Sequence, residues 1–224
     1  MRVVPRKLLL LPAGLALLAG CTSLFRSDAK PEQTYVLRAP AARAAPAAAT
    51  TASAAPAQPL AALQVAHPLA APGLDGPHIM LVQADHRMNF YLGSRWPGPV
   101  ADVVEALAVD TLRASGEWQS VEDSGSPFPA EYLLQISVRR FEADYTGGGA
   151  APTAVVVLDC TLGARAGRRL VTSFVAQGSA PAASDHMREV VAAFEQASDA
   201  ALGSLAGQTA AATRAFAERA STPH

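Results

Sequence analysis

The sequence contains few cysteines, no excess of basic side chains and no long apolar run beyond its first twenty residues. Two cysteines in 224 residues cannot build a disulfide framework. The formal net charge is −1, and loss of the three positive side chains in residues 1–20 leaves about −4. Nucleic-acid binding needs a basic face, so nucleic acid is not an expected partner.

Sequence signatures of common enzymes are also missing. There is no Gly-x-Ser-x-Gly motif, phosphate loop or dinucleotide fingerprint. The five histidines never stand three or four residues apart, and no cysteine–histidine cluster exists, so no metal site is expected. Asp75, Asp85 and Asp110 could meet in space, but solvated surface carboxylates are the simpler interpretation. We therefore expect no catalytic residue and no cofactor.

The chain begins with a secretory signal peptide. Arg2, Arg6 and Lys7 precede the apolar stretch 8–18, which is shorter than the ~20 residues of a membrane-spanning helix. The sequence Leu18-Ala19-Gly20-Cys21 then resembles the cleavage site of bacterial lipoproteins. That resemblance implies cleavage before Cys21 and acylation of its thiol, and two or three acyl chains form a durable membrane anchor. An ordinary secreted protein whose signal contains a cysteine is the alternative.

Residue 22 bears on which membrane would hold the anchor. In such lipoproteins an aspartate after the cysteine is the typical signal for retention in the inner membrane, and this chain has Thr22. We therefore expect a protein anchored on the periplasmic side of the outer membrane.

The composition changes along the chain and predicts six segments. Residues 39–62 are almost entirely Ala and Pro, and recurrent proline prevents a persistent helix, so this segment is a linker. The predicted segments are a signal peptide (1–20), a tether from the lipidated cysteine (21–34), a short strand that could dock on the domain (35–38), the Ala/Pro-rich linker (39–62), one folded domain (63–206) and an Ala-rich C-terminal tail (207–224).

Apolar periodicity within the domain predicts strands and two helices. Strands are expected at 78–83, 87–92, 118–121, 131–141, 153–162 and 169–177, with a hairpin tip at 85–86. One helix has Pro99 at its first position and ends at Gly116, and the other starts from a Ser184 cap with Asp185 in its first turn. The three long consecutive strands favour an antiparallel meander. The predicted fold class is α+β, a mainly antiparallel sheet with two helices on one face.

Four side chains are candidates for chemistry or binding. Cys160 alternates in phase with apolar neighbours, which favours a buried structural thiol over a reactive one. Tyr91 lies out of phase with the apolar face formed by Met88, Phe90 and Leu92, so it is a candidate for contact with a partner or a lipid. Arg95 and Trp96 form a strand-to-helix corner that could make the same contact, or Trp96 could close the core.

The sequence resembles the ABC-type transport auxiliary lipoproteins, the group that includes the paraquat-inducible lipoprotein C-like proteins. The resemblance covers residues 35 to about 205. Its pieces are Tyr35-Val36-Leu37, Ala71-Pro72-Gly73-Leu74-Asp75, Phe90-Tyr91 running into Ser94-Arg95-Trp96, the helix end at Leu112-Ser115-Gly116, and the strand from Tyr132 to Phe141. The Ala/Pro insert after residue 38 departs from the family pattern.

The resemblance implies a non-enzymatic, lipid-anchored component of an envelope lipid transport system. Its implied partners are an ABC permease complex, a mammalian-cell-entry-domain transport protein, phospholipid or another envelope lipid, and further copies of the chain. An envelope hydrolase or a sugar-binding lipoprotein is the alternative function.

Overall fold

The structure is a computed structural model that describes residues 31–40 and 58–221. The chain divides into two units, Met1–Glu32 and Gln33–His224, and the fold below is that of the second unit. The signal peptide, Cys21 and linker residues 41–57 lie outside the described residues. The expectations that concern them remain predictions.

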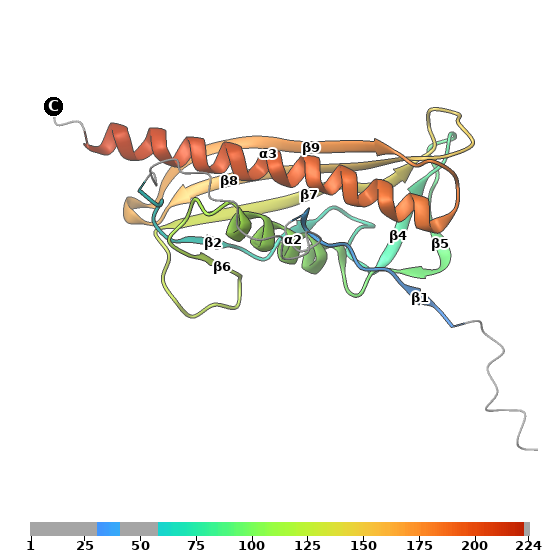
Figure 1. Cartoon of the computed structure of the whole chain (residues 1–224), viewed down its shortest axis with the longest axis horizontal. Helices are drawn as coiled ribbons and strands as arrows, with labels where there is room; N and C mark the ends of the chain where they lie inside the picture. The colour runs from blue at the N-terminus through green and yellow to red at the C-terminus, as the bar shows by residue number, and fades with distance from the viewer. Residues whose placement is uncertain (1–30, 41–57, 222–224) are drawn as a thin grey trace, which may run out of the picture. The chain divides into compact units, whose positions relative to one another are not determined.

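The sheet is built around β7 (Tyr132–Asp144), whose two edges are paired in different ways (Figure 1). Along one edge, β8 (Thr153–Ala164) pairs antiparallel over the whole length of β7, and β9 (Arg169–Pro181) pairs antiparallel with β8. A short 3₁₀ helix, η1 (Ala166–Arg168), connects β8 to β9. The predicted meander is therefore confirmed.

Three short strands line up along the other edge of β7, all parallel to it. They are β2 (Leu63–Val65), β3 (Leu69–Ala70) and β4 (His78–Val82). Outside them, β6 (Val121–Glu122) pairs with β2, and β5 (Met88–Arg95) pairs antiparallel with β4. The α+β class is confirmed, but these parallel pairs were not predicted.

The segment before the linker packs on the domain through β5. Strand β1 (Gln33–Thr34) runs parallel to β5, with Gln33 opposite Ser94, and the amide of Tyr35 donates to the carbonyl of Arg95 at 2.8 Å. Leu37 and Ala39 are buried in the core. The strand lies two residues before the range 35–38 expected from sequence.

Helix α2 (Val100–Ala114) packs its apolar stripe on the sheet. Pro99 is the N-cap residue, and Gly116 follows the helix with φ of +66°, a left-handed conformation that glycine adopts without a Cβ clash. The predicted helix and its end are confirmed, but the helix begins one residue later than expected, at Val100. Its buried side chains include Val100, Val104, Leu107, Ala108 and Leu112.

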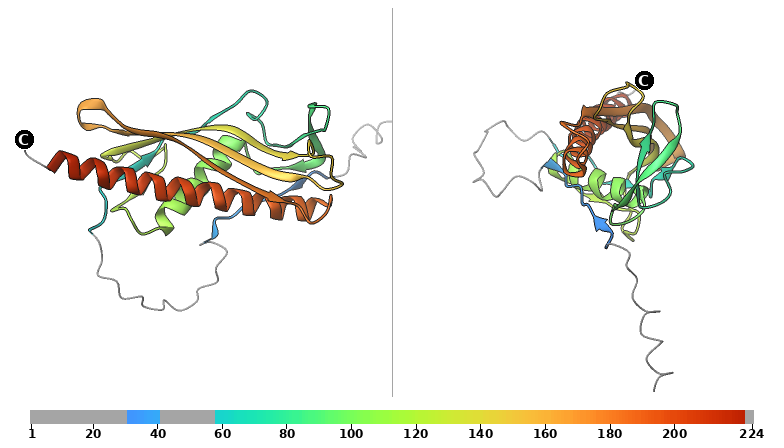
Figure 2. Two further views of the ribbon diagram at one scale, coloured as in Figure 1. Left: turned by 90° about the horizontal axis from the view of Figure 1, so that it is seen from above. Right: turned by 90° about the vertical axis from the view of Figure 1, so that its right-hand side faces the viewer.

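Helix α3 (Met187–Ser221) lies against β8 and β9, and Figure 2 shows both helices on the concave side of the sheet. Helix α3 continues unbroken past residue 206, where the sequence predicts the domain to end, and buries Thr209, Ala210 and Thr213. Both threonine hydroxyls donate to the carbonyl four residues earlier, which satisfies them inside an apolar contact.

The core side chains of β7, β8 and β9 alternate as the sequence predicts. Cys160 is 1% exposed and points inward with Val156, Leu158 and Leu162. Burial, reinforced by the charge of Asp159, raises the pKa of the Cys160 thiol to about 12. Because the thiolate is the reactive form, this cysteine is inert, as expected.

Candidate interaction surface

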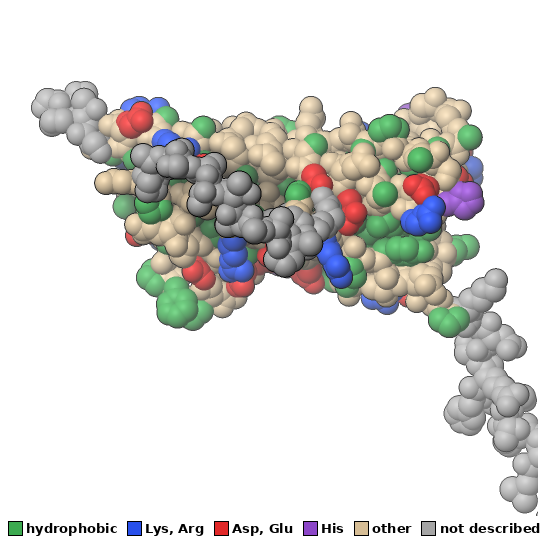
Figure 3. Space-filling view, in the orientation of Figure 1, with side chains coloured by type: hydrophobic (Ala, Val, Ile, Leu, Met, Phe, Trp, Pro, Cys, Tyr) green, Lys and Arg blue, Asp and Glu red, His purple; other side chains and the backbone are tan. Residues whose placement is uncertain are grey.

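The most exposed apolar cluster of the sheet lies on β5. Met88, Phe90 and Leu92 are 46%, 43% and 86% exposed, and we call these three residues the β5 patch. Register places Phe90 beside Met80 and Met88 beside Val82, on the convex face that turns away from the helices. Figure 3 shows the opposite side of the molecule, over which α3 runs, where hydrophobic side chains lie among polar and charged ones. Monomers rarely leave such apolar side chains together in water, so the patch is a candidate interaction surface.

Neighbouring groups hold the β5 patch in shape. The imidazole of His78 stacks on the ring of Phe90, with centroids 4.5 Å apart. Gly73 has φ of +89°, and a Cβ there would come within 3.1 Å of the Met88 sulfur. The loop that contains Gly73 therefore packs tightly against one end of the patch.

The two faces of β5 are exchanged relative to the sequence-based expectation. The apolar alternation of Met88, Phe90 and Leu92 suggested the core side, with Tyr91 outside it. In the structure these three side chains face outward, whereas Tyr91 is half-buried and packs against the core. Alternation defines two faces of a strand but does not tell which one is covered.

Tyr91 belongs to a polar network that ties three segments together. Its hydroxyl shares a 2.8 Å hydrogen bond with the hydroxyl of Tyr145, and Tyr145 in turn donates to the carboxylate of Asp185. Burial, together with the hydrogen bond to Asp185, raises the pKa of Tyr145, and burial also raises the pKa of Tyr91. The network fixes the β4–β5 hairpin to the connection between β9 and α3.

Asp185 therefore has a different role from the predicted one. It lies before α3, whose first residue is Met187, and its carboxylate accepts from Tyr145 instead of facing the first helical turn. Ser184 contacts His186 rather than the helix proper. The predicted helix start is thus about two residues too early.

The other two candidate residues lie at the end of β5. Trp96 is fully buried, so of the two interpretations considered for it the structure shows the one in which it closes the core. Arg95 is half-buried and donates from Nε to the carbonyl of Trp96 at 3.3 Å. Neither residue is part of the β5 patch. Cys21, the predicted lipidation site, lies outside the described residues.

A hollow of about 740 Å³ lies over β7, β8 and β9. It is lined by outward-facing residues of β7, β8 and β9 and by the loop that contains Gly147, among them Arg140, Asp144, Val155, Val157 and Gln177. Arg140 pairs with Glu142 at 2.7 Å and with Asp144 at 2.6 Å. Partial burial acts to raise the pKa of Asp144, but hydrogen bonds from Thr146 and Arg140 outweigh it and lower that pKa.

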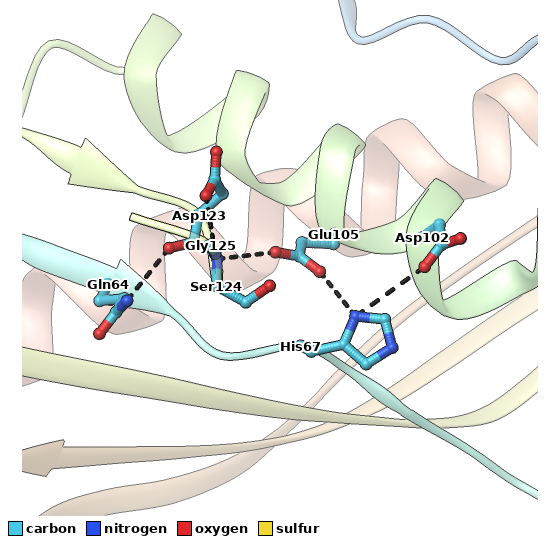
Figure 4. Close-up of polar contacts among 7 residues, drawn as sticks. All are labelled: Gln64, His67, Asp102, Glu105, Asp123, Ser124 and Gly125. Atoms are coloured by element: carbon cyan, nitrogen blue, oxygen red, sulfur yellow. Dashed lines mark hydrogen bonds and ion pairs between the residues drawn. The ribbon is translucent and has the colours of Figure 1, made fainter. Parts of the chain in front are cut away.

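A second polar cluster joins α2 to the loops around it (Figure 4). His67 Nδ1 lies 2.9 Å from one carboxylate oxygen of Glu105, and the amide of Ser124 donates to the other at 2.8 Å. Burial acts to raise the pKa of Glu105, but the hydrogen bonds from Ser124 and His67 prevail and lower it. The cluster fastens the β2–β3 connection and the loop after β6 to one helix, which is a structural role.

The sequence did not connect Tyr145 or Asp185 with Tyr91. They stand 54 and 94 residues from Tyr91 in the chain, and no local pattern connects such distant positions. The only local hint was that Tyr145 directly precedes the glycine-containing loop at the end of a long strand.

Comparison with known proteins agrees with this architecture. A solved structure of protein XCC0632 from Xanthomonas campestris superposes with a TM-score of 0.65 at 28% identity, covering 84% of this chain and 98% of that one. Lipoprotein GNA1162 from Neisseria meningitidis matches at 13% identity and a TM-score of 0.36, covering 70% and 99%. The PelC dodecamer from Paraburkholderia phytofirmans matches at 18% identity and a TM-score of 0.38, covering 64% and 84%.

The comparison with functionally curated proteins gave no significant match. No helix in the described part of the chain is both long enough and apolar enough to cross a membrane. The family model of the ABC-type transport auxiliary lipoprotein component matches residues 25–206, which include every strand from β1 to β9, all of α2 and the first part of α3. The chain therefore belongs to the ABC-type transport auxiliary lipoprotein family.

Proposed function

We propose that the protein is a lipid-anchored periplasmic component of an ABC-type envelope lipid transport system. In this proposal it acts as an adaptor or lipid-contacting subunit beside an ABC permease complex and a mammalian-cell-entry-domain protein. It performs no catalysis of its own. The lipoprotein cleavage site at Cys21 supports the anchor, and Thr22 supports the outer membrane as its location.

The single observation that carries the proposal is the β5 patch on a domain of this family. Three apolar side chains face away from a core that is already filled by the two helices, so their burial needs something outside the fold. An adaptor or a lipid-contacting subunit requires such a surface. Tyr91 and Arg95 support the patch from behind and from its end, respectively.

A hydrolase or sugar-binding function is favoured less by the geometry. The carboxylates beside the hollow, Glu142 and Asp144, are both paired with Arg140. A catalytic acid needs a raised pKa, whereas that of Asp144 is lowered.

Affinity purification from envelopes tests the proposal. A C-terminally tagged full chain, extracted with mild detergent, should recover the mammalian-cell-entry-domain protein and the ABC permease. The matched control is residues 22–224 secreted behind a signal peptide without a lipoprotein site, and it should be found in the periplasmic fraction. Recovery of the tagged, membrane-bound chain with neither transport protein would contradict the adaptor role.

A further inference from the structure

We propose that the β5 patch lies in the headgroup layer of the same bilayer that holds the Cys21 anchor. This inference rests on the proposed lipid anchoring and names what covers the patch. The contact orients the domain on the membrane, while the acyl chains provide the attachment itself.

The first support is where the chain enters the domain. Strand β1 places Gln33 opposite Ser94, two residues after Leu92, the most exposed apolar side chain of the sheet. The anchoring end of the chain therefore joins the fold next to the β5 patch.

The second support is the length of chain between the anchor and the fold. Twelve residue steps separate Cys21 from Gln33, and a chain extends at most ~3.3–3.6 Å per residue, or about 40 Å in all. The patch is thus held within reach of the bilayer surface at all times. Such tethering makes the second contact intramolecular and raises its effective concentration, an advantage that a separate protein partner lacks.

The third support is the charge around the patch. At the hairpin tip Arg87 is paired with Asp85 at 2.6 Å, so the two charges nearest Met88 along the chain cancel. The side chains of Met88, Phe90 and Leu92 are apolar, and the hairpin tip next to them carries no net charge from this ion pair. Their contact with lipid should therefore be apolar and only weakly dependent on salt.

The inferred orientation also determines which end of the domain is free. Strand β4 pairs with the last residues of β7, while the β8–β9 connection lies beside its first residues. With the β4–β5 end on the membrane, the end that carries η1 and Leu170 points into the periplasm. That end is then available to the transport proteins.

Site-directed spin labelling of the full lipidated chain tests this inference. A label at Leu92→Cys is compared with one at Leu170→Cys, which is 65% exposed and lies at the opposite end of the sheet. Only the introduced thiol should react, because Cys21 is acylated and Cys160 is buried with its pKa raised to about 12. The probe membrane is a vesicle of phosphatidylethanolamine and phosphatidylglycerol.

With vesicles present, the label at position 92 should lose access to a water-soluble relaxation agent and gain access to oxygen in the lipid. The label at position 170 should stay in water. Adding Phe90→Asp should return the position-92 label to water, whereas Phe128→Asp, which changes an aromatic residue 69% exposed in another loop, should not.

Several results would overturn the inference. The label at position 92 could remain as accessible to water as the label at position 170, could leave water only when the mammalian-cell-entry-domain protein is added, or could do so only as protein density on the vesicle rises. The last two outcomes would assign the patch to a protein partner or to a second copy, and the adaptor proposal would stand. If neither labelled variant associates with vesicles, the lipid anchor itself is missing and both proposals fail.

Discussion

Trp96, just after β5, meets Phe194 of α3 edge to face, with ring centroids 5.3 Å apart. Phe141 of β7 contacts both rings, at 5.8 Å from Trp96 and 5.2 Å from Phe194. All three side chains are almost completely buried. This trio joins the β4–β5 end of the sheet to its centre and to the long helix.

We expect Trp96→Ala to lower the free energy of unfolding by about 3–5 kcal/mol, because it leaves a large cavity beside two aromatic rings. Trp96→Phe should cost clearly less, since it keeps an aromatic ring in the site. Denaturant titration at one pH measures both. An equal loss of unfolding free energy in the two variants would mean that the aromatic contacts of residue 96 do not account for its contribution to stability.

The space around two glycines, one facing α3 and one within it, predicts opposite effects on stability for their substitution by alanine. A Cβ at Gly178 of β9 would lie 2.1 Å from the carbonyl oxygen of Ala197 and 2.8 Å from the amide nitrogen of Ala201, both backbone atoms of α3. Gly178→Ala should therefore destabilise by at least about 1–3 kcal/mol. Gly203 is exposed within α3 with nothing near its Cβ position, so Gly203→Ala should stabilise by about 0.5–1 kcal/mol. Thermal melts should show a lower melting temperature for Gly178→Ala and a higher one for Gly203→Ala than for the wild type.

Local pattern was enough to predict the regular parts of this fold. The three long strands, α2 and the inward phase of Cys160 follow from alternation and helical spacing. Their side chains report burial within a few residues of sequence, so no knowledge of distant segments is needed.

What the sequence could not predict depends on contacts between distant segments. The outward phase of Phe90 depends on which side of the sheet the helices occupy. The packing of α3 beyond residue 206 depends on small side chains such as Ala210, and a helix rich in alanine has no clear apolar stripe. The link from Tyr91 through Tyr145 to Asp185 arises only after the chain has folded.

The lowered pKa of Glu105 predicts how stability changes in acid. A carboxyl whose folded-state pKa lies below its ordinary value of 4.5 stabilises the protein above that value, and the contribution is lost as the pH falls through the folded-state pKa. Glu105→Gln should therefore lose less stability than the wild type as the pH falls from about 5 to about 3. His67→Ala should show a partial effect, since the Ser124 amide still donates. Urea titrations across this range would contradict the assignment if all three proteins had the same slope.

The network that holds the β4–β5 hairpin should contribute to stability without determining binding. Tyr145→Phe removes the hydroxyl that bridges Tyr91 and Asp185, and we expect a loss of about 0.5–1.5 kcal/mol. Tyr91→Phe should cost a similar or smaller amount. The double variant should cost less than the sum of the two, because they share one hydrogen bond.

The same network gives a signature in alkali. The pKa of Tyr145 is raised above its ordinary value of 10, so its stabilising contribution is complete below pH 10 and declines as the pH rises. Wild-type protein should therefore lose stability above about pH 10 more steeply than Tyr145→Phe. Tyr132→Phe is the control, because the Tyr132 hydroxyl takes no part in the network, and it should leave most of that slope in place. If Tyr145→Phe instead abolished membrane contact of the β5 patch while leaving the melting temperature unchanged, the hydroxyl would belong to the binding surface and the assignment of a purely structural network would be wrong.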